Sequence, residues 1–201
     1  MIDGTNELDT AVLTWMVDHR TPWVTDVMTV VTTVGNTVGV AVLTVILAAI
    51  VWRRGDRRAA LATLAVMLLG WGLMNGIKYA VRRTRPPTPE RLVDLSTWSF
   101  PSGHAMMSAM VAAVAIVLIG RGLLARRSVG SPGDLARKRG RAAAAVLTAA
   151  TLLIGFSRLY LGAHWCTDVL AGWVLGALWG TLALRASLSG AATSSVSDAV
   201  R

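Results

Sequence analysis

The residues best suited to chemistry in this sequence lie between Arg158 and Asp168, inside a very apolar half of the chain. Charged groups at membrane depth are costly and are retained mainly where they have a function. His164 and Asp168 are four residues apart, so on a helix they would share a face, and the carboxylate could accept a hydrogen bond from the imidazole. Gly162 weakens helix continuity just before His164, which places Arg158 and His164 on two different helix ends. This stretch therefore predicts half of a phosphate-handling active site.

Two further polar clusters have residue types that suit phosphate. Lys78 and Arg85 are seven residues apart, two helical turns, so both can point to one side of a helix end and donate to phosphate oxygens. Ser102, Gly103 and His104 stand directly before an apolar segment. Ser102 is a candidate helix cap, the Gly103 and His104 amides form an anion site, and His104 could give a proton to a departing oxygen. Each cluster alone also has a structural alternative: basic anchors at the membrane interface, a plain serine cap, or a His–Asp pair that closes a helix end.

The composition indicates an integral membrane protein. Of 201 residues, 54% are hydrophobic and only 15% are charged, which is too apolar for an ordinary soluble domain. The net charge of +9 lies largely beside apolar segments and forms no basic stripe on a soluble scaffold, so we expect no nucleic-acid partner. Cys166 is the sole cysteine, which excludes an intramolecular disulfide and a thiolate zinc cluster.

The order of apolar segments predicts an all-α, integral membrane helical bundle. Residues 1–20 form an amphipathic interfacial segment, residues 21–186 the membrane domain, and residues 187–201 a disordered tail. A short or re-entrant helix at 23–35 precedes the full spans, each near the roughly 20 residues that a bilayer needs. Two loops, at 86–100 and 120–141, are too polar to cross. We expect five full spans, at about 37–52, 59–80, 102–119, 142–160 and 165–184.

The distribution of basic residues predicts the orientation in a bacterial plasma membrane. The 53–58 turn and the 120–141 loop are rich in Arg and Lys and fall on one side together with the C-terminal end, and the positive-inside rule makes that side cytoplasmic. The opposite, outer side then holds the 81–102 loop, the 161–165 turn and all three polar clusters. Four arginines violate the rule on that side, and an anionic ligand would explain them: Arg82, Arg83, Arg85 and Arg91.

The three clusters resemble, in order and with the family's spacing, the three-part signature of the type 2 phosphatidic acid phosphatase family. The resemblance covers roughly residues 59–184 and implies a six-helix core. Each cluster alone is a weak or moderate signal, whereas the three together are specific. The matching segments are Lys78-x6-Arg85-Pro86, Pro101-Ser102-Gly103-His104 and Ser157-Arg158-x5-His164-x3-Asp168.

The resemblance implies a metal-independent phosphatase that works through a phosphohistidine. His164 would be the nucleophile, Asp168 its orienting partner and His104 the acid that protonates the leaving oxygen. The phosphate oxygens would be held by Lys78, Arg85, Ser102, Gly103 and Arg158. Fixed cations supply much of what a metal otherwise would in phosphoryl transfer, and few carboxylates lie near the site, so we expect neither a metal nor a cofactor.

The expected substrate is a phosphorylated lipid in the bilayer. Undecaprenyl diphosphate is the first expectation, because the compact chain resembles bacterial members of the family that act on polyprenyl diphosphates or phosphatidylglycerol phosphate. Phosphatidylglycerol phosphate or phosphatidate is the alternative. A transporter-like bundle that binds a phosphorylated lipid without chemistry is the alternative of another class, and it has no need for the paired His104 and His164.

Overall fold

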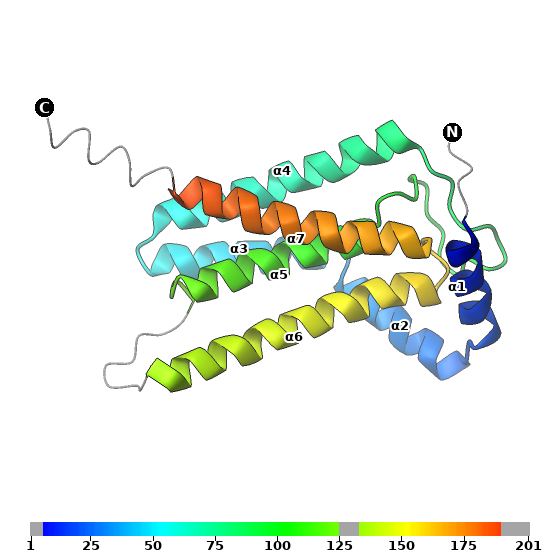
Figure 1. Cartoon of the computed structure of the whole chain (residues 1–201), viewed down its shortest axis with the longest axis horizontal. Helices are drawn as coiled ribbons and strands as arrows, with labels where there is room; N and C mark the ends of the chain where they lie inside the picture. Colours follow the sequence, from blue (N-terminus) through cyan, green and yellow to red (C-terminus); the bar gives the residue numbers. More distant parts are fainter. Residues whose placement is uncertain (1–5, 125–132, 190–201) are drawn as a thin grey trace, which may run out of the picture.

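The structure, a computed structural model, describes residues 6–124 and 133–189 (Figure 1). This part of the chain forms seven helices and no strand, which confirms the predicted all-α fold. The helices are α1 (Glu7–Asp18), α2 (Pro22–Val34), α3 (Thr37–Arg53), α4 (Arg57–Val81), α5 (Gly103–Gly120), α6 (Gly133–Tyr160) and α7 (Cys166–Ser189).

Four helices are long and apolar enough to cross a membrane: α4, α5, α6 and α7. The predicted full span at 37–52 is different, because α3 has 17 residues and continues from α2 at a bend of 48°. Counted together, α2 and α3 form a fifth, broken span. The break has a local cause, since the Asn36 side chain accepts from the Gly39 amide and so starts a new helix.

Two predicted loop boundaries are wrong by several residues. Helix α6 begins at Gly133, inside the predicted 120–141 loop, because residues 134–141 are mostly good helix formers. Asp134 lies in the first turn of α6 and pairs with Arg137 at 3.0 Å, which adds support to this exposed end. Helix α7 runs through Ser189, so the predicted tail starts as helix, and the rest of that tail lies outside the described residues.

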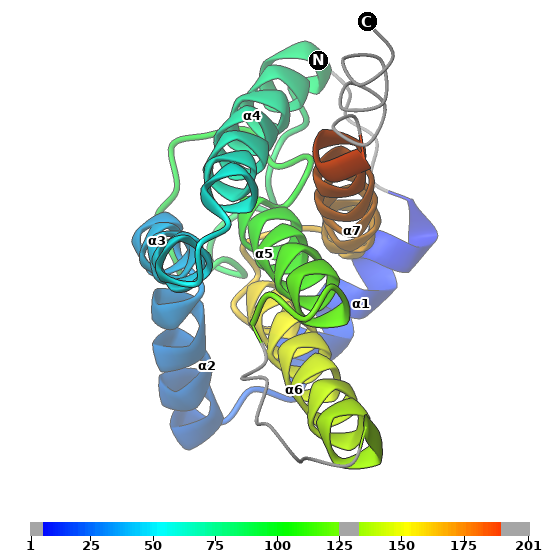
Figure 2. The same cartoon turned by 90° about the vertical axis from the view of Figure 1, so that its left-hand side faces the viewer.

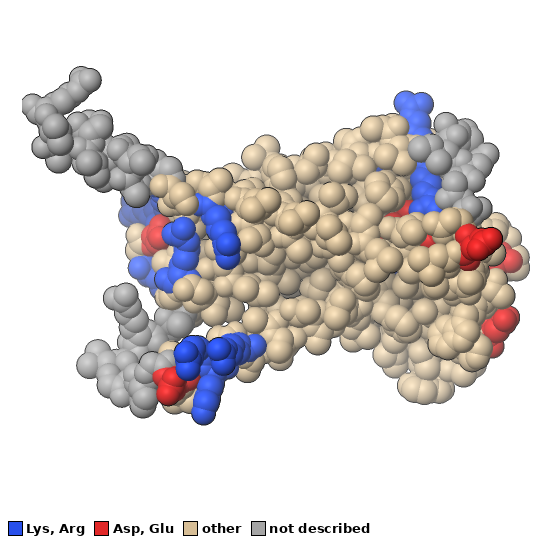
Figure 3. All heavy atoms as spheres, viewed as in Figure 1, with Lys and Arg blue, Asp and Glu red and all other residues tan. Residues whose placement is uncertain are grey.

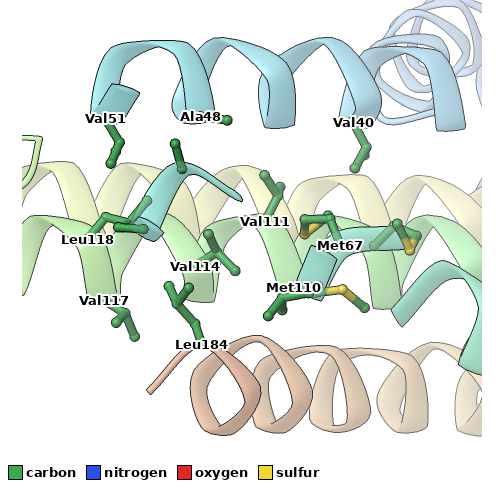
Figure 4. Close-up of a cluster of buried hydrophobic side chains, with 14 of the residues drawn as sticks. Val40, Ala48, Val51, Met67, Met110, Val111, Val114, Val117, Leu118 and Leu184 are labelled. Atoms are coloured by element: carbon green, nitrogen blue, oxygen red, sulfur yellow. The ribbon is translucent and has the colours of Figure 1, made fainter. Parts of the chain in front are cut away.

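Helix α5 is the centre of the bundle. Figure 2 shows it surrounded by α3, α4, α6 and α7. In α5, 72% of the residues are buried, against 22 to 33% in the apolar stretches of α4, α6 and α7. Its buried side chains meet those of α3, α4 and α7 in one cluster (Figure 4), which includes Val51, Met67, Met110, Val114 and Leu184. The first turn of α5 is therefore fixed from several sides.

Small residues bring α7 into close contact with α5. Gly172, Gly176 and Gly180 repeat every four residues, the small-xxx-small spacing that lets membrane helices approach closely. A Cβ atom on Gly176 would lie 2.1 Å from the Met106 carbonyl oxygen. At the end of this contact the Ser102 amide donates to the Asp168 carbonyl at 3.0 Å. The glycine contact thus places the start of α7 beside the start of α5.

Replacing Gly176 by alanine is expected to destabilise the bundle by about 1–3 kcal/mol, because the new methyl group meets backbone rather than a movable side chain. Thermal unfolding in detergent measures the change. Gly72→Ala is the matched control, since a Cβ there meets nothing within 4 Å, and it should be neutral or stabilising by up to about 1 kcal/mol. Equal melting temperatures for the two variants would contradict the contact.

Charged side chains gather at the two ends of the molecule and leave an uncharged band between them (Figure 3). One end holds the α3–α4 turn, the start of α6 and the end of α7, and it is rich in Lys and Arg. At this end the start of α4 is bonded to the end of α7, because Arg58 donates to the Ser187 carbonyl at 2.6 Å. The opposite end holds α1, the 82–102 loop and the α6–α7 turn. The predicted grouping of loops into two sets therefore agrees with the fold.

Candidate active site

The three polar clusters meet in one cavity of about 230 Å³ at the end of the bundle that carries α1. Helix α4 ends toward that end, α5 begins there, and the α6–α7 turn lies at the same end (Figure 1). Six of the eight predicted site residues line the cavity: Lys78, Arg85, Gly103, His104, Arg158 and His164. Ser102 and Asp168 lie behind this lining and are fully buried.

His164 lies in the turn before α7, not on the helix as the four-residue spacing suggested. The turn depends on Gly162, which has a φ of 64° and approaches the Glu90 carbonyl so closely that a Cβ would lie 2.3 Å from its oxygen. His164 Nδ1 lies 3.5 Å from Asp168 Oδ2. The predicted neighbourhood of the two residues is present, and a turn rather than a shared helix face creates it.

The contacts of His164 define its tautomer. Arg85 Nη1 lies 3.1 Å from His164 Nε2, and because a guanidinium can only donate, Nε2 must accept. Nδ1 then carries the proton and faces the Asp168 carboxylate. Burial, followed by the positive charges of Arg85 and Lys78, lowers the pKa of His164 well below its ordinary value. With the proton on Nδ1 and Nε2 as the acceptor, the lone pair of the ring lies on Nε2 in a site lined by cations.

Asp168 is held by several donors. Its Oδ2 accepts from the Trp165 amide at 3.1 Å and from the Ser99 hydroxyl at 2.5 Å. The first contact is half of a capping box, because Trp165 directly precedes α7 and Asp168 lies in the first turn. Arg83 Nη1 donates to Oδ1 at 2.6 Å. Ser99 lies outside the three motifs, Arg83 occupies an unspecified position of the first motif, and no spacing in the sequence singled them out.

Lys78 and Arg85 fix the loop that precedes α5. Lys78 Nζ donates to the carbonyls of Trp98 and Pro101 at 2.8 and 2.7 Å. Arg85 donates through Nε to the Thr97 carbonyl and through Nη1 to the Ala163 carbonyl, both at 2.6 Å. Burial lowers the pKa of Arg85 to about 10, so it stays charged at neutral pH. Both cations therefore shape the cavity as well as lining it.

Arg158 and Ser102 have polar groups that find no partner among the described residues. Arg158 is 2% exposed; one of its terminal nitrogens donates to Thr32 Oγ1, while its Nε has no partner there. Ser102 precedes α5, but its hydroxyl does not cap the helix as predicted and is likewise unpaired in the described chain. Leaving a buried donor unpaired costs about 1–3 kcal/mol, which a bound anion would relieve. With the exposed amide ends of Gly103 and His104, these groups form a suitable anion site.

The N-terminal helices contribute to the cavity, although the family resemblance stops short of them. Gly35 and Thr37, at the break between α2 and α3, line it, and Thr32 holds Arg158. A Cβ on Gly35 would lie 2.6 Å from Ile154 Cγ2, so α2 packs tightly against α6 here. No motif marks these residues. Only the bend of the α2–α3 pair brings them to the site.

The rest of the cavity wall is mostly apolar and reaches the outer surface of α4. Met74 and Met107 lie beside the cations, and Trp71 is 45% exposed on α4. Within the described chain, no group of three or more His, Cys, Asp or Glu side chains is placed to hold a metal ion. The cavity therefore combines a polar, cation-rich end with an apolar wall, an arrangement suited to an amphiphile with an anionic head.

Comparisons with known proteins agree with this geometry. Residues 59–189 match the model of the PAP2 superfamily. The chain is 32% identical over 159 residues to phosphatidylglycerophosphatase B of Bacillus subtilis, covering 79% of this chain and 73% of the relative. The crystal structure of a transmembrane PAP2-type phosphatidylglycerolphosphate phosphatase from Bacillus subtilis is similar, with a TM-score of 0.75, 31% identity and coverage of 87% of this chain and 82% of that one. The crystal structure of Aquifex aeolicus LpxE shares the fold, with a TM-score of 0.67, 21% identity and coverage of 92% and 99%.

Proposed function

The chain belongs to the PAP2 superfamily, and from that membership we propose that it is a membrane phosphatase that removes the terminal phosphate of phosphatidylglycerol phosphate. The observation that carries the proposal is the position of His164, whose Nε2 lies 3.1 Å from Arg85 Nη1 in a cavity lined by Lys78, Arg85 and Arg158. A nucleophile surrounded by fixed cations is what phosphoryl transfer without a metal requires.

The relatives favour phosphatidylglycerol phosphate over undecaprenyl diphosphate, the first expectation from the sequence. The curated relative and one similar structure both carry phosphatidylglycerol phosphate phosphatase in their names. The cavity suits such a substrate, because its cation-rich end would hold one phosphoryl group and its apolar wall at Trp71 would lie along the lipid.

The proposed reaction has two steps. His164 Nε2 attacks phosphorus while the bond from phosphorus to the lipid oxygen breaks, and His104 gives its proton to that oxygen. Asp168 stabilises the positive charge that develops on the His164 ring. In the second step, His104 takes a proton from water, the water oxygen attacks phosphorus, and the phosphorus–nitrogen bond breaks to release inorganic phosphate. The three cations stabilise the equatorial oxygens in both steps.

The basic end of the bundle supports an orientation with the C-terminus in the cytoplasm. The positive-inside rule places the end that holds the α3–α4 turn and the start of α6 there. The site would then face outside, at headgroup level. A reporter domain fused after Arg127 should be cytoplasmic, and a reporter that is active outside the cell would invert this orientation.

Phosphate release from pure lipids in detergent tests the proposed function. Wild-type protein is incubated with phosphatidylglycerol phosphate, phosphatidate or undecaprenyl diphosphate, each with and without EDTA. We expect the highest kcat/KM for phosphatidylglycerol phosphate and no effect of EDTA. A preference for undecaprenyl diphosphate would replace the proposed substrate, and loss of activity with EDTA would overturn the metal-free mechanism. Binding of all three lipids without turnover would favour the transporter-like alternative.

Replacing His104 by glutamine is expected to lower kcat on the lipid substrate by about 10²–10⁴-fold, because the leaving alkoxide loses its proton donor. With an aryl phosphate, whose leaving group needs no proton, phosphoenzyme should still form while its hydrolysis stays slow. Stopped-flow absorbance should then show a burst of phenolate equal to the enzyme concentration. Equal losses on both substrates without a burst would contradict the role of His104 as the proton donor.

A further inference from the structure

A buried row of charged side chains joins the N-terminal helix to Asp168. Arg83 lies between two carboxylates: its Nη1 is 2.6 Å from Asp168 Oδ1, and its Nη2 is 2.5 Å from Asp9 Oδ2. Asp9 and Asp168 are fully buried and Arg83 is 6% exposed. Asp9 lies outside the three motifs and outside the segment that matches the family, and Arg83 occupies an unspecified position of the first motif.

Contacts with Thr167 hold the Asp9 side chain, which extends from α1, against the first turn of α7. Its Oδ1 accepts from the Thr167 amide at 2.8 Å, and the Thr167 hydroxyl lies 2.8 Å from its Oδ2. The same hydroxyl accepts from Arg83 Nη1 at 2.7 Å. Helix α1 is thus tied to the first turn of α7, the turn that carries Asp168.

Arg83 also acts on Asp168 through its backbone. Arg82 ends α4 in the left-handed region with a φ of 52°, which turns the chain so that Arg83 is buried while Arg82 is exposed. The Arg83 carbonyl accepts from the Ser99 amide at 2.9 Å, and the Ser99 hydroxyl donates to Asp168 Oδ2. Arg83 therefore contacts one carboxylate oxygen directly and supports the donor to the other.

We propose that Arg83, held in place by Asp9, is a positioning residue that keeps the Asp168 carboxylate directed at His164 Nδ1. The proposal rests on the proposed function of His164 as the nucleophile. It assigns α1 a part in the reaction, since α1 supplies the carboxylate that anchors Arg83.

The physical reason is the charge balance around Asp168. The charged or ionisable groups that act on it are Arg83, His164 and, from farther away, Lys78, Arg85 and Cys166. Without Arg83, the buried carboxylates of Asp9 and Asp168 would face each other with no cation between them, and their repulsion would turn Asp168 away from His164 Nδ1. The tautomer with the proton on Nδ1 would lose its partner. His164 would then carry its proton on Nε2 and lose the lone pair that attacks phosphorus.

Steady-state kinetics on phosphatidylglycerol phosphate test this positioning. Arg83→Gln should lower kcat by about 10²-fold with little change in KM. Arg83→Lys should recover part of the loss. Adding Asp9→Asn to Arg83→Gln should also restore part of kcat, because the carboxylate that repels Asp168 is gone. Arg82→Gln is the matched control and should behave as wild type.

A second measurement separates this proposal from the proposed function. ¹⁵N NMR of histidine-labelled protein reports the tautomer of His164 without turnover, with its signals assigned from the His164→Ala variant. Wild type should carry the proton on Nδ1 and Arg83→Gln on Nε2. If wild-type protein released no lipid phosphate and the tautomer of His164 still differed between wild type and Arg83→Gln, the proposed function would be refuted and the positioning role of Arg83 would stand. A folded Arg83→Gln protein with the wild-type tautomer and wild-type kcat would overturn the positioning. Should Arg83→Gln fail to fold, unchanged results for Arg83→Lys and Asp9→Asn would overturn it equally.

Discussion

His164→Ala is expected to reduce phosphate release by at least about 10⁴-fold, the scale seen when a covalent nucleophile is removed. The structural reason is that, among the described residues that line the cavity, His164 presents an Nε2 lone pair beside Lys78, Arg85 and Arg158. Its contact with Arg85 holds that nitrogen in place. His104 cannot replace it, because it extends from the first turn of α5 and no ion pair joins its ring to a carboxylate among the described residues. Phosphate release and trapping of ³²P-labelled protein at acid-quenched time points measure the loss.

His19→Ala is the matched control for this variant. His19 lies at the end of α1, stacked on Trp15 at 4.5 Å between ring centroids, and it does not line the cavity. The control should keep wild-type kcat and labelling. If His164→Ala retained more than a small part of the wild-type activity, or still formed labelled protein, the proposed nucleophile would be wrong.

Asp168→Asn is expected to lower kcat by about 10³–10⁴-fold with a small change in KM, by analogy with the loss of the orienting aspartate in serine proteases. An amide has the shape of the carboxylate but can donate to His164 Nδ1, which favours the tautomer with the proton on Nε2. It also leaves Arg83 and Ser99 facing a neutral group, so the developing imidazolium loses its counter-charge. Initial rates on phosphatidylglycerol phosphate give both constants.

Loss of folding would mimic this result, so the melting temperature of Asp168→Asn must be measured alongside. Asp134→Asn is the control, because that side chain is 76% exposed at the opposite end of the bundle and should change neither the rate nor the melting temperature. A folded Asp168→Asn protein with kcat within about tenfold of wild type would show that Asp168 does not set the tautomer of His164.

Much of the fold and the site follows from local sequence. The apolar segments at 59–80 and 142–160 lie within helices of the structure, and those at 102–119 and 165–184 do so from their second residue on, because the length of an apolar run is enough to define a span. The three motifs lie at helix ends, and the distribution of basic residues among the loops predicts that these ends share one side of the membrane. Each motif occupies one short segment, so its residues stay close together in any fold that keeps those helices. The three motifs meet at one cavity because the helix ends that carry them lie at the same end of the bundle.

Long-range packing decided the rest. Arg82, Arg83 and Arg85 look alike in sequence, but one left-handed residue at the end of α4 leaves Arg82 exposed, buries Arg83 against Asp168 and places Arg85 in the cavity. Asp9 and Thr32 reach the site only because α1 packs against α7 and the α2–α3 bend returns the chain to it. Sequence periodicity reports which residues share a face of one helix, whereas contacts between distant segments depend on how the helices pack. Local sequence therefore determined the groups that would do the chemistry, and the tertiary structure alone decided which residues hold them in place.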